Sequence, residues 1–188
     1  MKKLFLTAAA VLALTTVNAQ DITFGAKAGV NLANADAGDF DTDAVTSFHI
    51  GVTAELPISD KFSVQPELLY SIQGAASVSD PDTTINTDFI NLPIMAKYYV
   101  AEGLSLEAGP QIGFLVKAEN NNDKTSETRD IKDSFKSVDF GFNIGAGYKL
   151  ESGLNFALRY NLGLSDITED DDDTWKNRVL QLSVGYTF

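Results

Sequence analysis

Apolar and polar residues alternate with a period of two in eight separate segments of the chain. Because side chains of a β-strand point alternately to its two faces, each segment predicts a strand with one apolar face and one polar or small face. The last segment is the clearest, since every second residue from Leu180 to Phe188 is apolar. The predicted strands are residues 22–32, 48–56, 62–73, 90–100, 104–116, 138–150, 154–164 and 176–188.

The connections between these strands alternate in length. Residues 57–60, 101–103 and 151–153 are short and contain the Gly, Pro, Ser and Asp residues that tight turns favour. Residues 33–46, 74–88, 118–135 and 165–175 are long, polar and rich in Asp and Glu. Short periplasmic turns and long external loops are typical of outer-membrane barrels, and a tilted strand of about 10 residues crosses the hydrocarbon. The pattern therefore predicts an all-β fold, an eight-stranded antiparallel up-and-down transmembrane β-barrel with both termini on the turn side.

The alternation does not by itself say which face is inside. A soluble, lipocalin-like barrel would turn its apolar face inward, whereas a membrane barrel turns it to lipid. Phe188 ends an unbroken apolar face, and aromatic residues gather near both ends of the predicted strands, as in interfacial belts. These features favour lipid outside. The expected belts are Phe24, Phe62, Tyr98, Tyr148, Phe156, Tyr186 and Phe188 near the turns, and Phe48, Tyr70, Phe89, Phe114 and Phe140 near the loops, with Trp175 just above.

Three prolines, Pro66, Pro93 and Pro110, lie inside predicted strands. Proline lacks the backbone N–H that a strand donates to its neighbour. We therefore expect a bulge or a locally broken pair at each of them.

Residues 1–19 have the features of a signal peptide, and residues 20–188 are then one barrel domain. Lys2 and Lys3 precede an apolar run from Leu4 to Val17, and small residues end at Ala19. An uncleaved anchor helix is the alternative, although the run is shorter than the about 20 residues that a membrane helix needs. No later segment is long and apolar enough for such a helix. We expect export to the outer membrane of a Gram-negative cell.

Composition excludes several kinds of site. The chain has no Cys, so it forms neither disulfides nor thiolate metal sites. Its formal net charge of −12 argues against nucleic acid as a partner, because phosphate binding needs clustered Lys and Arg. No cofactor is predicted.

The predicted inward face carries both signs of charge. Because eight strands enclose room for side chains only, these residues are expected to plug the lumen as a paired polar network. A gated ion or proton path, or a site for a small polar ligand, is the alternative. Inward glycines would either leave a void or make room for long side chains from across the barrel. The predicted network is Lys27, Glu55, Glu67, Lys97, Glu107, Asp139, Lys149 and Arg159.

His49, the only histidine, is predicted to point inward near the loop rim, with Ser47 close in sequence. A nucleophile needs an adjacent base and an orienting carboxylate, so a lipid-modifying or hydrolytic rim enzyme is one hypothesis. A hydrogen-bonded rim residue is the favoured interpretation, and a zinc site is disfavoured because further His or Cys ligands are missing.

Acidic residues also gather in the loops, in the run Glu169–Asp173 and at Asp36, Asp39, Asp41 and Asp43. Such oxygens can bind Ca²⁺, but the spacing lacks the glycine and terminal Glu of an EF-hand. A solvated, self-repelling loop is the favoured interpretation, and cation bridging to anionic lipid headgroups is the alternative.

Three segments resemble the PorT-like outer-membrane β-barrel family: VQPELLYSIQG at 64–74, DFINLPIMAKYYV at 88–100 and LSLEAGPQIGFLV at 104–116. The resemblance covers essentially the whole chain and implies the barrel fold. Some members of that family are linked to protein secretion, so an accessory secretion component is one hypothesis. A non-enzymatic structural or interaction protein acting through acidic loops is the favoured hypothesis.

Expected partners are outer-membrane lipid, the barrel-insertion machinery through the C-terminal strand, and other envelope proteins. The protein itself is expected to be a monomer.

Overall fold

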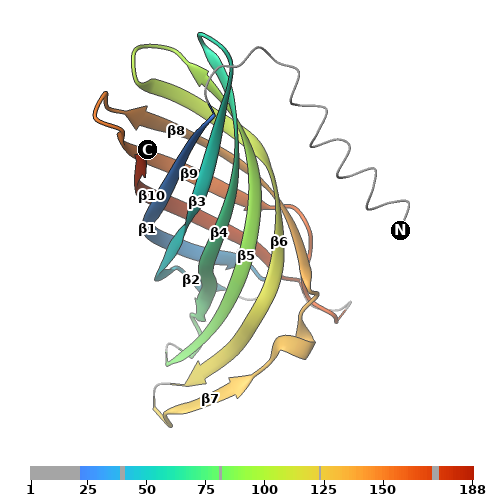
Figure 1. Ribbon diagram of the computed structural model, residues 1–188. Helices are drawn as coiled ribbons and strands as arrows, with labels where there is room; N and C mark the ends of the chain where they lie inside the picture. The colour runs from blue at the N-terminus through green and yellow to red at the C-terminus, as the bar shows by residue number, and fades with distance from the viewer. Residues whose placement is uncertain (1–21, 39–40, 81, 123, 171–173) are drawn as a thin grey trace.

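The computed structural model describes residues 22–38, 41–80, 82–122, 124–170 and 174–188, and within them the chain forms a closed antiparallel β-barrel (Figure 1). Each barrel strand pairs with its sequence neighbours, and β1 pairs with β10 to close the wall. The predicted eight-stranded up-and-down topology is confirmed. The barrel strands are β1 (Thr23–Asp36), β3 (Val45–Ser59), β4 (Phe62–Ser77), β5 (Thr83–Tyr99), β6 (Leu104–Asn122), β8 (Val138–Lys149), β9 (Leu154–Gly163) and β10 (Lys176–Thr187).

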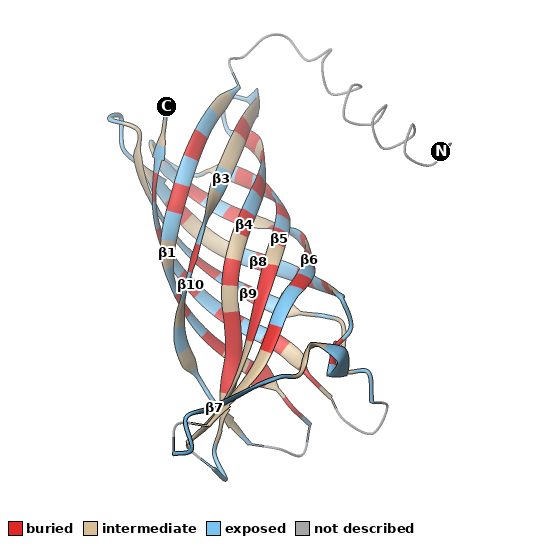
Figure 2. Cartoon of the chain, turned by 60° about the horizontal axis from the view of Figure 1, so that its bottom comes forward, coloured by how far each residue is buried: buried red, intermediate tan, exposed pale blue. Residues whose placement is uncertain are grey.

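The two faces of the wall differ as the alternation predicts. Buried and exposed residues follow each other along the strands in narrow bands (Figure 2). Most residues buried inside are polar or charged, while large apolar side chains such as Leu106, Ile144 and Leu182 are more than half exposed on the outside. A soluble barrel with its apolar face inward is therefore wrong for this chain, because its apolar surface requires lipid.

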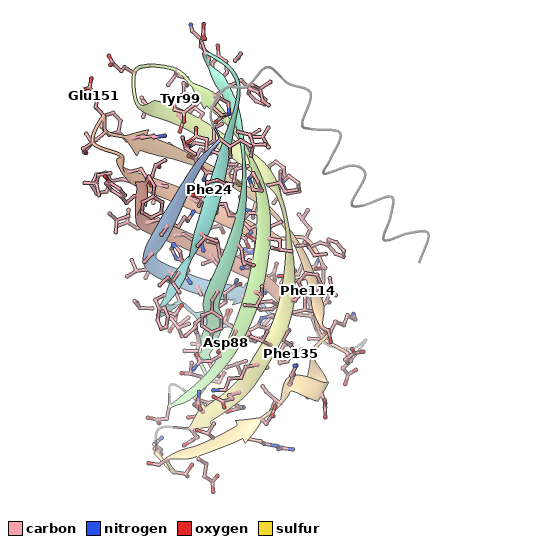
Figure 3. All side chains as sticks on the ribbon, in the orientation of Figure 1. Phe24, Asp88, Tyr99, Phe114, Phe135 and Glu151 are labelled. Atoms are coloured by element: carbon pink, nitrogen blue, oxygen red, sulfur yellow. The ribbon has the colours of Figure 1, made fainter. Side chains whose placement is uncertain are left out.

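The first and last strands of the barrel begin and end beside the short turns. The Phe188 N–H donates to the Phe24 carbonyl at 2.8 Å, and the Thr187 N–H donates to the Gly153 carbonyl at 2.9 Å. In Figure 3, Phe24, Tyr99 and Glu151 accordingly lie at one end of the barrel, and Asp88, Phe114 and Phe135 lie towards the other. The turn end is thus the periplasmic end, as expected for an outer-membrane barrel.

Two of the predicted loops are largely strand. Pairing between β4 and β5 continues to Ala76↔Thr84, and β6 continues to Asn122, where it pairs with the short strand β7 (Glu127–Asp130). The backbone ladder thus continues beyond the predicted strand ends, although apolar and polar residues no longer alternate regularly there. The loop end also holds β2 (Thr42–Asp43), which pairs with β4, and the 3₁₀ turn η2 (Lys132–Ser134). β7 and the ends of β5 and β6 project beyond the other strands (Figure 1).

The three strand prolines each interrupt a ladder without changing its register, which confirms the expected broken pairs. The two register shifts lie elsewhere, at Pro57/Ser59 and at Asp88/Phe89. The pairs that flank the gaps are Thr53↔Glu67 and Leu56↔Val64 around Pro66, Pro66↔Ile94 and Leu69↔Asn91 around Pro93, and Pro93↔Gln111 and Ala96↔Ala108 around Pro110.

Two members of the expected loop-side belt were assigned wrongly. Phe89 is 0% exposed, because it follows a register shift and shares the inward face with Asn91. Trp175 is 6% exposed and packs inside the loop end. Phe48, Phe114 and Phe140 do face outward. The outer aromatic residues are therefore denser at the turn end than at the loop end.

The predicted signal peptide lies outside the described residues. Within the described residues, no helix has the length and apolar character needed to cross a bilayer.

The outward face of β9 gives a test of lipid contact. Leu158 is 52% exposed midway along β9, and arginine on the lipid face of a barrel near its midplane costs about 2–4 kcal/mol. Leu158→Arg should lower the free energy of unfolding by that amount in denaturant titrations of the protein in lipid vesicles. Ser152→Arg, in the β8–β9 turn, is the control and should change it by less than about 0.5 kcal/mol. Equal effects of the two variants would mean that Leu158 does not touch lipid.

Candidate functional site

The turn-side half of the lumen is filled by one group of charged side chains, here called the lumen charge cluster. Its members come one each from β1, β3, β4, β5, β6, β8 and β9, so only the closed barrel brings them together. Seven of the eight sequence-predicted charges belong to it, and Asp139 does not. The lumen charge cluster consists of Lys27, Glu55, Glu67, Lys97, Glu107, Lys149 and Arg159.

Arg159 lies at the centre of the cluster and is fully buried. Its Nη1 and Nη2 atoms donate to both carboxylate oxygens of Glu67, at 2.9 and 3.0 Å. Nη2 also donates to Glu107 Oε2 at 3.0 Å, and Lys27 Nζ donates to Glu67 Oε2 at 3.0 Å. Bidentate arginine–carboxylate pairs are among the strongest charge-assisted hydrogen bonds. Each of these buried charges therefore has an opposite charge in contact.

Glu55 anchors the periplasmic end of the cluster. Its carboxylate accepts hydrogen bonds from Tyr99 and from Ser63, the latter at 2.9 Å, and from Lys149 Nζ at 3.4 Å. The Lys149 side chain is 30% exposed, so the cluster meets water at the periplasmic opening. Lys97 Nζ lies between Glu55 and Glu107, at 3.8 and 3.6 Å from their oxygens.

Little open space remains beside these side chains. The cavity that they line holds about 30 Å³, room for about one water molecule. Gly147 shows why the inward glycines are needed, since a Cβ there would lie 2.4 Å from Glu107 Oε1. The glycine makes room for a cluster side chain and leaves no void. Four bases face three acids, so the cluster carries a formal charge of +1.

A neutral layer follows towards the loops and holds His49, which is 0% exposed. Asn31 donates its amide hydrogens to Ser71 Oγ and to backbone carbonyls, so its Oδ1 is an acceptor. His49 Nδ1 therefore donates to Asn31 Oδ1 at 2.8 Å, and Nε2 accepts from Ser183 Oγ at 2.8 Å. His49 is hydrogen-bonded as expected, but it lies buried in the middle layer of the lumen and not at the loop rim.

The expected partner of His49 in a rim enzyme, Ser47, lies elsewhere and donates to the Ile72 carbonyl at 2.6 Å. The order Ser183, His49 and Asn31 does match nucleophile, base and orienting group. However, all three side chains are buried, and the adjacent space is too small for a substrate. Sequence reasoning missed Ser183 because β10 meets β1, and hence His49, only when the barrel closes.

Asp139 lies towards the loop end, apart from the cluster. Its carboxylate accepts from Asn177 Nδ2 at 2.9 Å and from Ser165 Oγ at 2.7 Å. Asn177 Oδ1 in turn accepts the indole N–H of Trp175 at 3.1 Å. Asp139 thus helps to hold the last loop onto the barrel.

The loop end of the lumen is closed by an apolar group, here called the loop cap, which the sequence interpretation did not foresee. Trp175 and Phe135 meet edge to face, with ring centroids 5.7 Å apart, and Ile167 is 0% exposed. Isolated large apolar residues within otherwise polar loops were the signal that could have revealed it. The loop cap consists of Ala35, Ala37, Ala75, Phe89, Leu115, Ala118, Phe135, Ile167 and Trp175.

Asp166 fixes the loop that carries Trp175. Its Oδ1 accepts the backbone N–H of Trp175 at 2.9 Å, and the N–H and hydroxyl of Thr168 at 3.1 and 2.9 Å. Partial burial raises the pKa of Asp166, but the hydrogen bonds donated to its charged form outweigh burial, so the pKa lies below its usual 3.8. The ionised carboxylate therefore stabilises this loop conformation.

In the part of the chain that the structure describes, no three His, Asp or Glu side chains gather closely enough to hold a metal ion. Asp171–Asp173 and Asp39, which belong to the calcium hypothesis, lie outside the described residues.

A closed antiparallel barrel with an apolar outside, a charged lumen and both ends at the short turns defines a small outer-membrane β-barrel protein. The chain belongs to the outer membrane protein beta-barrel domain family, whose pattern matches residues 18–169. Its location is the cell outer membrane.

Solved structures share this fold at low sequence identity. Neisserial surface protein A is 11% identical, with a TM-score of 0.61, covering 90% of this chain and 100% of that protein. Ail, the attachment invasion locus protein of Yersinia pestis, is 14% identical, with a TM-score of 0.56 and the same coverage. No curated protein matches the sequence significantly. The likeness to these structures establishes the fold alone.

The lumen charge cluster gives a stability prediction. Glu67→Gln keeps the shape of the side chain but leaves Lys27 and Arg159 without the carboxylate between them. Breaking a buried ion pair in this way costs about 3–5 kcal/mol, which denaturant titration should measure. Glu102→Gln removes an exposed acid from the β5–β6 turn and should leave stability within about 0.5 kcal/mol of the wild type. A loss no larger than in this control would show that Glu67 does not neutralise the cluster.

The hydrogen bonds of Asp166 predict that the conformation of the last loop depends on pH. The fluorescence of Trp175, the only tryptophan, can measure this dependence. Because the folded pKa is lowered, the stabilisation is complete above pH 3.8 and is lost as pH falls further, through the folded pKa. Trp175 emission should therefore shift to the red in that acidic range. Asp166→Ala should show the shifted emission already at neutral pH, whereas Asp133→Ala, on η2, should keep the wild-type profile. An unchanged emission in Asp166→Ala would contradict this role.

Proposed function

We propose that this protein is a non-enzymatic interaction protein whose filled barrel anchors acidic loops at the cell surface. The observation that carries this proposal is the filled lumen. The lumen charge cluster occupies the turn-side half of the lumen, and the loop cap closes the other end. The outer loops are therefore the surface that is available for binding partners.

The loops have the size and charge that such a role needs. The last loop, residues 165–175, contains six acids and no base. β7 and η2 carry the exposed acids Glu127, Asp130 and Asp133 together with the bases Arg129 and Lys132, so the unbalanced negative charge lies mainly in the last loop. A dense field of one sign attracts partners of the opposite sign over about a Debye length, 8–10 Å at physiological salt. The partner surface is therefore basic, or is bridged by divalent cations.

The fold neighbours fit a surface role. Ail is named as an attachment invasion locus protein, and Neisserial surface protein A is named for its location. Their names support attachment as the kind of interaction that this chain makes.

An accessory role in protein secretion is a second proposal, which the PorT-like resemblance suggests. Two of the resembling segments fall on β5 and β6, the longest strands, at 17 and 19 residues. Their projecting ends would be the contact surface for secretion subunits. Copurification of such subunits with the native protein, lost on shortening the β5 and β6 projections, would support this role over simple attachment.

The proposed function makes a prediction for intact cells. Cells that display the protein should bind fluorescent decalysine in a salt-sensitive manner. The triple variant Glu127→Gln, Asp130→Asn and Asp133→Asn should weaken that binding several-fold, because it removes exposed loop charge. Glu102→Gln with Glu151→Gln, in the periplasmic turns, is the matched control and should bind as the wild type does. The proposal would be contradicted if the triple variant bound decalysine as well as the wild type does. Stepwise ion currents through the purified protein in planar bilayers would also contradict it.

A further inference from the structure

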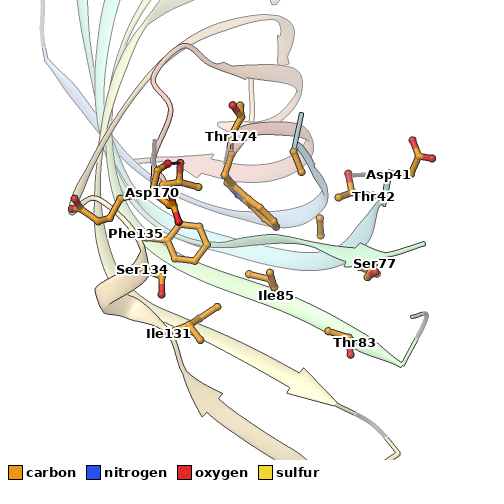
Figure 4. A pocket seen from close by; sticks show the side chains of 16 residues that line it. Asp41, Thr42, Ser77, Thr83, Ile85, Ile131, Ser134, Phe135, Asp170 and Thr174 are labelled. Carbon is orange, nitrogen blue, oxygen red and sulfur yellow. Dashed lines mark hydrogen bonds between the residues drawn. The ribbon is translucent and has the colours of Figure 1, made fainter. Parts of the chain in front are cut away.

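The loop end of the barrel contains a cavity that is separate from the lumen charge cluster. It has a volume of about 1020 Å³ and lies between the loop ends of β4 and β5, the start of β2, and the segments around Phe135 and Trp175 (Figure 4). Small-molecule sites usually measure about 300–1,000 Å³. The cavity, here called the loop-mouth pocket, is therefore large enough for a drug-sized ligand.

The floor of the loop-mouth pocket is apolar and aromatic. Trp175 and Phe135 line it together with Ile85 and Ile131, and the floor rests on the loop cap. The Trp175 indole N–H is already donated to Asn177, so the ring offers carbon surface. The edge-to-face contact between the two rings fixes their orientation before a ligand arrives. Such a floor binds a flat or bulky hydrophobic body.

The rim of the pocket is acidic. Asp41, Glu169 and Asp170 line it, and among the described residues no Lys or Arg does. A cleft lined by one sign of charge over low-dielectric walls concentrates ligands of the opposite sign. Aromatic rings attract organic cations in addition.

We propose that the loop-mouth pocket binds a lipophilic organic cation. Its hydrophobic body lies against Trp175, Phe135 and Ile85, and its positive centre faces the rim carboxylates. A bare metal ion fits less well, because the described carboxylates form no group of three that could hold one and the floor offers carbon only. This inference does not rest on the proposed function, since a small ligand in the pocket requires no macromolecular partner.

A matched pair of ions tests the inference. Tetraphenylphosphonium and tetraphenylborate have nearly the same size and shape and opposite charge. Each is titrated onto protein purified from the outer membrane and placed in nanodiscs, with Trp175 emission as the signal and empty nanodiscs subtracted. The phosphonium ion should give a saturable change with a dissociation constant at least about tenfold below that of the borate ion.

Variants at Ser134 separate charge from shape. This side chain is exposed and lines the pocket, so a longer residue there leaves the barrel intact. Ser134→Lys brings a positive charge to the pocket and should weaken phosphonium binding about tenfold or more. Ser134→Gln adds neutral bulk and should bind phosphonium within about twofold of the wild type. Ala76→Phe fills part of the cavity without adding a second tryptophan and should abolish the signal, with folding checked by heat-modifiable gel mobility.

Each outcome of these titrations either supports or overturns the inference. Preference for phosphonium, loss of that preference in Ser134→Lys and its retention in Ser134→Gln support the inference. Borate binding as tight as phosphonium binding, equal weakening in the Lys and Gln variants, or no saturable signal from either ion overturns it. None of these outcomes depends on whether the loops bind a basic macromolecule, so a failure here leaves the proposed function to its own test.

Discussion

The structure depends on the neutralisation of Arg159 inside the barrel. A membrane barrel turns apolar side chains to lipid, so an inward charge needs a counter-charge or hydrogen-bond donors within the lumen. Arg159 reaches Glu67 through two hydrogen bonds and Glu107 through a third, while Lys27 binds the same Glu67 carboxylate. These residues come from four strands, β1, β4, β6 and β9, so the pairing and the closure of the wall stabilise each other.

The lumen is organised in three layers from turns to loops. Charged pairs fill the first, amides and His49 the second, and the loop cap the third. The charged layer opens to water only at Lys149, and the apolar layer covers the opposite end. This order places the buried charges away from the external medium, and the cavity beside the charged layer holds only about 30 Å³.

The loop end combines order with negative charge. Asp166 and Asp139 hold the last loop onto the barrel through Trp175, Thr168 and Asn177, and Trp175 packs against Phe135. These contacts make a fixed apolar floor beneath an acidic rim. A macromolecule would meet the projecting acids of β7 and η2, while a small cation would meet the loop-mouth pocket. The two surfaces are adjacent, and both include Glu169 and Asp170 of the last loop.

The sequence by itself determined the number of strands, their order, the face that each turns to lipid and the broken pairs at Pro66, Pro93 and Pro110. The strands and the broken pairs follow from period-two alternation and backbone chemistry, which act locally within each strand. The choice of the lipid-facing side followed from Phe188 and from the aromatic residues near the strand ends. Only the tertiary structure decided that Arg159 meets Glu67, that Asp139 lies outside the cluster and that Ser183, not Ser47, faces His49. Strand tilt and stagger set the height of each inward residue, and closure sets which residues face each other, so residues far apart in the chain become partners. The loop cap and its pocket depend on the same long-range geometry, because polar loop sequences carry no periodic signal that places Trp175 inside.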